Sequence, residues 1–298
     1  MSEFKHLNKT AIQALELSEK ERIKRIRSPR WIGYPTAKQV LDKMDDLLNY
    51  PPSHRMPNLL VVGESNNGKT MLLKRFASLH PAIDNPNGDG VLAPVIYMEA
   101  PPVPDEGRFY ADILDILFAP YRTSSRAGDK EKQAIGILRK VGTRLLIIDE
   151  IHHLLAGSSS KQKAFLNMIK HLGNRLEASI VAAGTKDAFR AIQTDPQLSN
   201  RFKPALLPTW KFGTDFRRLL ISFERMIPLK KPSDLQKPSL AMKLHSMSEG
   251  NIGELSNLLI EAAVQAVRTG SECINEKTLK SIDWASPSER KKIITRTR

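Results

Sequence analysis

The stretch VVGESNNGKT at residues 61–70 decides the fold, because an apolar run opens there into a polar loop bounded by two glycines. The spacing Gly63-x-x-x-x-Gly68-Lys69-Thr70 matches the phosphate-binding (Walker A) pattern at every position. In such a loop backbone N–H groups turn toward phosphates, the lysine reaches the β and γ oxygens, and the threonine ligates Mg²⁺. Residues 58–63 read as a buried strand and residues 69–80 have helical spacing. The sequence therefore predicts a nucleotide site in which a helix N-terminus faces the phosphates.

A second motif lies eighty residues further on, in RLLIIDEIHHLL at 144–155. Four apolar residues precede Asp149-Glu150, which predicts a strand whose tip carries a Walker B pair. Asp149 would hold Mg²⁺ and Glu150 would polarise the attacking water as general base. His152 and His153 are adjacent on an expected helix, which should aim their rings apart, so we expect no shared metal. GESNN lacks the second glycine of a nucleophile elbow. ATP and Mg²⁺ are the expected ligands.

The remaining elements favour one class of nucleotide-binding sheet. Residues 91–100 and 178–185 read as strands, and the segments at 110–120, 129–142 and 163–176 read as helices. That order predicts a parallel sheet with an extra strand between the phosphate-loop strand and the acidic strand. This arrangement is typical of the additional-strand ATPases.

Two further residues are candidates for a functional role, and each also has a purely structural interpretation. Thr185, at the end of the strand at 178–185, is either a sensor of the γ-phosphate or a strand-terminating turn. Arg201, in DPQLSNRF at 195–202, is either a finger that reaches a neighbouring subunit's nucleotide or a surface salt-bridge arginine.

From Gly213 onward the pattern becomes helical, with Pro and Gly separating four segments at 215–229, 238–250, 254–270 and 275–284. A small helical domain after an α/β core is the outline of an AAA+ ATPase with its lid. The expected fold is thus an α/β AAA+ P-loop core, a parallel sheet flanked by helices, with an all-helical lid. The expected division is an N-terminal helical extension with an adenine-side segment (1–55), the core (56–210), the lid (211–284) and a basic tail (285–298). Residues 9–31 read as one amphipathic helix that packs either on a neighbouring subunit or on its own core.

Composition limits the setting. The formal net charge is +14 and the pI is about 9.8, which favours a nucleic-acid partner. Cys273 is the single cysteine, so no internal disulfide and no thiolate zinc site can form, and we expect the reducing cytoplasm. No apolar run approaches the about 20 residues of a membrane-spanning helix, so we expect no membrane partner.

Several segments resemble the TniB family of AAA+ transposition ATPases, which is related to TnsC and occurs beside a DDE transposase and a targeting protein. They are RSPRWIGYPTA (27–37), RMPNLLVVGESNNGKTMLLKRF (55–76), LLIIDEIHHLLAGSSSKQKAFLN (145–167) and the SNRF stretch at 199–202. The resemblance spans roughly residues 5 to 285.

This resemblance implies a set of site residues. Trp31, Ile32 and Tyr34 would lie near the adenine, Thr70 and Asp149 at Mg²⁺, and Glu150 would be the base. The residues on the phosphates would be Gly63, Glu64, Ser65, Asn66, Asn67, Gly68, Lys69, Thr70 and Met71. The lid run GNIGEL (250–255) departs from the pattern, because it lacks the arginine that many AAA+ proteins place there. We therefore expect ATP hydrolysis that is slow and stimulated by DNA or a partner.

The resemblance also implies a function. Such proteins assemble with ATP into head-to-tail rings or helical filaments on double-stranded DNA of any sequence. They recruit a DDE transposase and a targeting protein of the TniQ type, and hydrolysis drives disassembly. The alternatives are a helicase loader or replication initiator of the same clade, and a signalling NTPase that does not use DNA.

The insertion GRFYADILDILFAPYRTSSRAGDK at 107–130 is the expected DNA-binding surface, since Lys, Arg, Ser and Thr contact phosphates. Its candidate residues are Arg108, Arg122, Thr123, Ser124 and Arg126. A solvated loop is the alternative.

Overall fold

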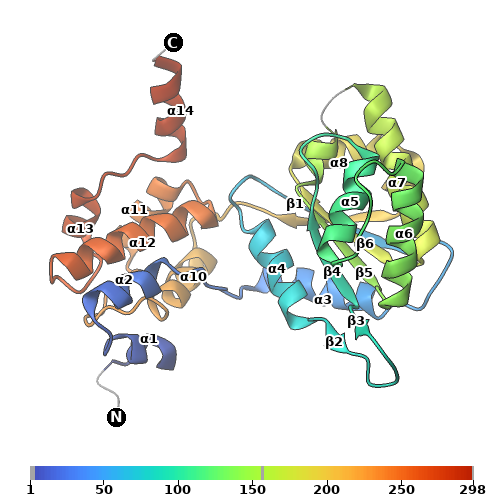
Figure 1. The fold of residues 1–298 in the computed structure, drawn as a ribbon. Helices are drawn as coiled ribbons and strands as arrows, with labels where there is room; N and C mark the ends of the chain where they lie inside the picture. The colour runs from blue at the N-terminus through green and yellow to red at the C-terminus, as the bar shows by residue number, and fades with distance from the viewer. Residues whose placement is uncertain (1–3, 156–157, 297–298) are drawn as a thin grey trace. The chain divides into compact units, whose positions relative to one another are not determined.

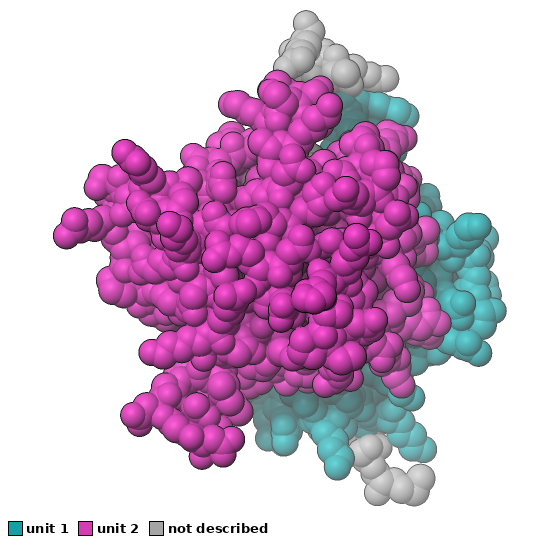
Figure 2. Space-filling view, turned by 90° about the vertical axis from the view of Figure 1, so that its right-hand side faces the viewer, with its two compact units in different colours: residues 1–34, 209–298 teal, residues 35–208 magenta. Residues whose placement is uncertain are grey.

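The computed structural model describes residues 4–155 and 158–296, which form two compact units. Figure 2 colours the units separately. A sheet unit contains residues 35–208, and a helical unit combines residues 1–34 with 209–298. The predicted extension at 1–55 is therefore divided after Tyr34: the segment up to Tyr34 packs with the C-terminal helices, and residues 35–55 belong to the sheet unit.

The sheet unit is built on five parallel strands in the order β4-β5-β6-β1-β7 (Figure 1). The strands are β1 (Asn58–Gly63), β4 (Val95–Glu99), β5 (Leu145–Asp149), β6 (Ser179–Gly184) and β7 (Phe202–Leu207). A separate antiparallel pair joins β2 (Ile83–Asp84) to β3 (Val91–Leu92). β6 lies between β1 and β5, which confirms the predicted extra strand and the fold class.

The central strands are buried on both faces, as their continuous apolar sequences require. Every residue of β1, β5 and β6 is buried. Helices cover the sheet: α3 (Pro35–Leu48), α4 (Lys69–Leu79), α5 (Glu106–Ile116), α6 (Ala127–Lys140), the 3₁₀ helix η1 (Ile151–Leu155), α7 (Ser159–Leu176), α8 (Lys186–Gln193) and α9 (Pro196–Ser199). Helix α5 begins four residues before its predicted start, because the Asp105 side chain caps it by accepting the Arg108 N–H at 2.9 Å.

Strand register brings the functional segments to one edge. Val62 pairs with Gly184, and Ala182 pairs with Ile148, so β1, β6 and β5 end together. In parallel sheets ligands bind at this carboxyl edge. The phosphate loop, the acidic pair and Thr185 all lie at these strand ends.

The helical unit packs α10 (Thr214–Glu224), α11 (Pro238–Ser248) and α12 (Ile252–Arg268) around a core that includes Phe216, Leu244 and Leu258. The shorter helix α13 (Glu276–Ser281) and the terminal helix α14 (Pro287–Arg296) come next. None of the helices in the described part of the chain has the length and apolarity that crossing a bilayer requires.

The N-terminal segment forms two helices where the periodicity predicted one, α1 (Lys9–Ala14) and α2 (Glu19–Arg27). A capping box at Ser18 causes the break: the Ser18 hydroxyl accepts the Glu21 N–H at 3.4 Å, and Glu21 accepts the Ser18 N–H at 3.2 Å. Ile26 of α2 is fully buried in the helical core. The segment thus packs on its own chain.

Candidate nucleotide site

The phosphate loop is held in shape by its backbone and by one amide. Asn66 (φ 59°) and Gly68 (φ 83°) adopt left-handed conformations that turn the chain into α4. At Gly63 an added Cβ would meet the Leu207 carbonyl oxygen at 3.1 Å, so the loop and β7 approach closely. Asn67 is 2% exposed and donates to the carbonyls of Leu207 at 2.7 Å and Pro208 at 3.2 Å. The loop is therefore tied to the end of β7.

Lys69 is buried at the start of α4, where its ammonium lies over the loop. Its Nζ donates to the carbonyl oxygens of Gly63 at 3.0 Å and Glu64 at 2.9 Å. Burial lowers the pKa of Lys69, and the charges of Glu150, Asp149 and Glu64 act in the opposite direction. An ammonium that rests on its own loop's carbonyls is poised to move to phosphate oxygens, so this loop fits ATP.

The other predicted loop residues divide by exposure. Glu64, Ser65, Asn66 and Met71 are exposed, Thr70 and Gly68 are half-buried, and Gly63 and Asn67 are buried. Backbone N–H groups at the N-terminus of α4 have no side-chain cap at Gly68, which suits an anion.

Asp149 closes β5 and is 1% exposed. One carboxylate oxygen accepts the Glu150 N–H at 2.9 Å, and the other accepts the Tyr97 hydroxyl at 3.1 Å. Burial, followed by the charge of Asp149, raises the pKa of Tyr97, so the hydroxyl keeps the proton that it donates. A buried, oriented carboxylate near Lys69 fits Mg²⁺, which prefers oxygen ligands.

Sequence reasoning missed Tyr97. The usable signal is its place in β4, where it pairs with Ile147 of the acidic strand. Lys74 of α4 places its Nζ 5.6 Å from the Tyr97 ring. A tyrosine on the strand beside an Asp-Glu tip is thus part of the site.

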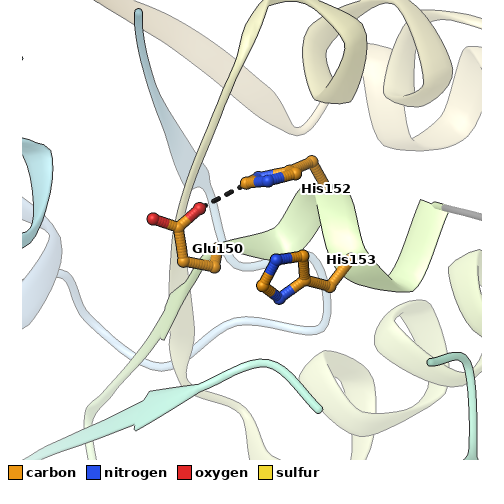
Figure 3. A group of neighbouring side chains, drawn as sticks. All are labelled: Glu150, His152 and His153. Atoms are coloured by element: carbon orange, nitrogen blue, oxygen red, sulfur yellow. Dashed lines mark ion pairs between the residues drawn. The ribbon is translucent and has the colours of Figure 1, made fainter. Parts of the chain in front are cut away.

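Glu150 has φ 53° and turns the chain from β5 into η1. Figure 3 shows its carboxylate facing His152, whose Nδ1 lies 3.0 Å from Oε2. The two histidine rings have centroids 4.6 Å apart, so the expectation that they point apart is wrong. The rotation per residue of a helix does not determine side-chain torsions, and these bring the rings together on η1.

Glu150, His152 and His153 place one ligand atom each within 4.8 Å of one another. His152 lies beside the Glu150 carboxylate, and its Nδ1 makes no hydrogen bond within the described part of the chain.

Thr185 comes directly after β6 and stands at the N-cap of α8. It lines a cavity of about 470 Å³ together with His152, Asp187 and Arg190. Gly184 permits this packing, because a Cβ there would lie 2.7 Å from the Ala188 Cβ. Thr185 thus shares the carboxyl edge with Glu150.

Arg201 lies elsewhere. It precedes β7, and β7 runs parallel to β1 from Phe202 opposite Asn58, so Arg201 stands at the amino edge of the sheet. Six strand residues, about 20 Å, separate that edge from the phosphate loop. Its Nη1 donates to Asn174 Oδ1 at 2.7 Å. Burial, with the nearby charge of Arg55, lowers the pKa of Arg201. Arg201 cannot serve its own chain's phosphates.

The predicted adenine residues belong to the helical unit, whereas the phosphate loop belongs to the sheet unit. Ile32 is 9% exposed in the helical core, and Trp31 is half-buried. The Tyr34 ring meets the Trp210 ring edge to face at 5.1 Å, and burial raises the pKa of Tyr34 to about 12.

The predicted DNA-binding residues lie on or beside two helices: Arg108 on α5, then Arg122, Thr123, Ser124 and Arg126 before α6. All five are exposed. Acidic residues accompany them. Burial raises the pKa of Asp112, and the charge of Arg108 acts in the opposite direction. Asp115 accepts a hydrogen bond from the Tyr121 hydroxyl at 3.2 Å. The segment 107–130 contains four basic and three acidic residues, so it is nearly neutral.

Comparison with known proteins agrees with this geometry. Residues 22–212, more than half of the chain, match the family described as bacterial TniB protein. The ClpB chaperones of Aquifex aeolicus and Wolinella succinogenes are 24% and 26% identical over 152 residues. That match covers 50% of this chain but only 14% and 16% of the chaperones.

Solved structures show the fold. The Orc1 protein of Aeropyrum pernix, solved in complex with DNA, has a TM-score of 0.58 at 15% identity and covers 91% of this chain and 69% of its own. Cdc6p of Pyrobaculum aerophilum has a TM-score of 0.60 at 15% identity, covering 84% of this chain and 67% of its own. The fold is that of the AAA+ ATPases, and the chain belongs to the TniB family.

Proposed function

We propose that this chain is an ATP-dependent regulator of transposition that assembles on double-stranded DNA and recruits a DDE transposase. The observation that carries the proposal is the convergence of Lys69, Asp149, Glu150 and Thr185 at one sheet edge, in a chain of the TniB family. ATP is the substrate, and its hydrolysis drives disassembly.

The residues of the site have distinct roles in this proposal. Lys69 leaves the carbonyls of Gly63 and Glu64 and binds the β and γ oxygens of ATP. Thr70 and Asp149 would hold Mg²⁺, which would supply positive charge to the phosphate oxygens. Glu150 takes a proton from the attacking water, and Thr185 contacts the γ-phosphate or that water.

Slow basal hydrolysis has two structural supports. The His152 Nδ1 lies 3.0 Å from the Glu150 carboxylate without hydrogen-bond geometry, close enough to compete with the attacking water for the base. In the lid, Glu254 forms an ion pair with Arg290 at the place where other AAA+ proteins supply an arginine. We therefore infer that DNA or a partner stimulates turnover by releasing Glu150.

Arg201 is the proposed finger of a neighbouring subunit. Its position at the opposite sheet edge suits a head-to-tail ring or helical filament, in which one subunit's amino edge meets the next subunit's nucleotide. A guanidinium there stabilises charge on the transferring phosphate.

DNA contact is proposed from the net charge of +14 and from the exposed Arg108, Arg122, Thr123, Ser124 and Arg126. Backbone contacts carry no base code, so binding would not depend on sequence. A targeting protein of the TniQ type is a further proposed partner. The assignment of Trp31, Ile32 and Tyr34 to the adenine stays a prediction.

The direct test is fluorescence anisotropy of a random-sequence duplex with ATP, ADP or no nucleotide, together with electron micrographs. We expect tight, salt-sensitive binding and regular oligomers with ATP alone, and neither with Lys69→Ala. DNA binding that does not depend on nucleotide would contradict ATP-dependent assembly, because the net charge alone would then account for the binding.

A further inference from the structure

One face of α2 carries an unusual set of cations. Lys20, Ile23, Lys24 and Arg27 stand at positions i, i+3, i+4 and i+7, so they share one face of the helix. Arg268, the last residue of α12, completes the same surface. These five residues and Ser28 line a groove of about 390 Å³ within the helical unit. We call it the α2 groove.

The cations of the α2 groove are not neutralised. Among the residues that the structure describes, no carboxylate lies within ion-pair distance of Lys20, Lys24, Arg27 or Arg268. Glu21 influences Lys24 electrostatically, but its carboxylate is committed to the cap at Ser18. Like charges at this spacing repel one another.

The buried side of the same helix is different. Arg22 points into the unit, where its side chain is 7% exposed and pairs with Glu272. Nη1 of Arg22 donates to Glu272 Oε2 at 3.0 Å. Helix α2 therefore pairs the cation that it buries and leaves exposed those that face the groove.

We propose that the α2 groove binds the phosphate backbone of nucleic acid. Lys20 and Arg27 are seven residues apart, about 10 Å along the helix. One strand of B-DNA has a phosphate about every 3.4 Å along the duplex axis, so a helix lying parallel to that axis would span about three phosphates with its three cations. Lysine and arginine side chains are the usual phosphate contacts of proteins on DNA.

An anionic membrane fits the groove less well. A helix that lies on a membrane presents a broad exposed apolar face beside its cations. The groove's apolar residue is Ile23, which is half-buried against the helical core. The phosphate of nucleic acid, and not of a lipid headgroup, is thus the expected contact.

The inference rests on the proposed DNA binding and extends it from the sheet unit to the helical unit. Its test uses the full chain with Lys20→Ala, Lys24→Ala, Arg27→Ala and Arg268→Ala combined. The matched control removes four cations exposed elsewhere in the same unit: Arg25→Ala, Arg217→Ala, Lys277→Ala and Lys280→Ala. A charge-preserving variant (K20R, K24R, R27K, R268K) tests for rescue. Thermal melting verifies that each variant is folded.

The measurement is duplex affinity with ATP across a salt series. The slope of log K against log salt is negative, and each lost phosphate contact reduces its magnitude by about 0.9, so we expect the groove variant to reduce the magnitude by about three. Affinity should fall at least about tenfold, with the control and the charge-preserving variant close to wild type.

Equal slopes for the groove variant and the control would overturn the inference while leaving the proposed function intact. Absence of DNA binding by the wild type would instead refute the proposed DNA binding, and the inference with it. Inorganic phosphate is titrated calorimetrically in parallel. Groove-dependent phosphate binding without a change in the DNA slope would also overturn the inference, by identifying a site for free phosphate.

Discussion

The phosphate loop and the tip of β5 lie at the same sheet edge but are built differently. Backbone requirements shape the loop: Gly68 is left-handed, and Gly63 has no room for a Cβ beside Leu207. Side chains shape the β5 tip, where the Tyr97 hydroxyl donates to Asp149 and His152 lies beside Glu150. A backbone requirement is visible in sequence as a glycine at a fixed spacing, whereas a side-chain contact from another element is not.

The two regions also differ in which residues adopt a left-handed backbone conformation. Glu150 adopts φ 53°, a conformation that costs an L-residue about 1–2 kcal/mol. In the loop the left-handed residues are Gly68, for which that cost is absent, and Asn66, a residue type that adopts this conformation more readily than glutamate. Such strain concentrates where function constrains the chain. The two regions should therefore respond differently to substitution.

Lys69→Ala should have the largest effect. Removing the ammonium that rests on the loop carbonyls should weaken ATP binding by about 100-fold or more, since charge-assisted contacts to phosphate are lost. Calorimetry with ATP measures it, with the exposed Lys38→Ala of α3 as control. Near-normal affinity would mean that the loop binds ATP through its backbone alone.

Glu150→Gln should distinguish the role of the β5 tip in hydrolysis from the role of the loop in ATP binding. We expect hydrolysis to fall by about 100-fold or more, because the general base is lost, while ATP affinity stays within a few fold. Single-turnover hydrolysis and calorimetry on the same preparation measure both. An equal loss of affinity would show that the tip binds ATP and would remove the distinction.

Tyr97→Phe removes the hydroxyl that orients Asp149 and keeps the ring. Loss of a group that orients a metal ligand costs about 10- to 100-fold in metal affinity. We expect the Mg²⁺ concentration for half-maximal hydrolysis to rise by about tenfold, with the maximal rate recovered at high Mg²⁺. The comparison is Tyr110→Phe, because the buried Tyr110 hydroxyl makes no hydrogen bond within the described part of the chain. An unchanged Mg²⁺ requirement would argue against an orienting role.

His152→Ala should have the smallest effect, and in the opposite direction. Freeing the Glu150 carboxylate should raise basal hydrolysis a few fold and reduce stimulation by DNA, since the base no longer needs release. His153→Ala serves as control, because its ring neighbours His152 without the 3.0 Å contact to Glu150. Lower basal activity in His152→Ala would mean that the histidine supports Glu150 during turnover.

Sequence reasoning succeeded where one pattern decides the local structure. The strand before Gly63, the helix after Gly68 and the insertion of β6 between β1 and β5 all result from buried apolar runs and motif spacing. It failed where distant side chains decide. The Tyr97 hydroxyl that donates to Asp149 comes from another strand, and the α2 groove depends on Arg268, which lies 241 residues after Arg27 in the chain.

The position of Arg201 has a kinetic consequence. Because the length of β7 separates this guanidinium from the loop of the same chain, an isolated molecule lacks it at its own ATP. With Arg201 acting between subunits, ATP turnover per molecule would rise with protein concentration and would fall on dilution. A filament would also have unequal ends: the terminal subunit whose nucleotide faces no neighbour would keep its ATP longest. The distribution of ATP and ADP along such an assembly would therefore indicate its polarity.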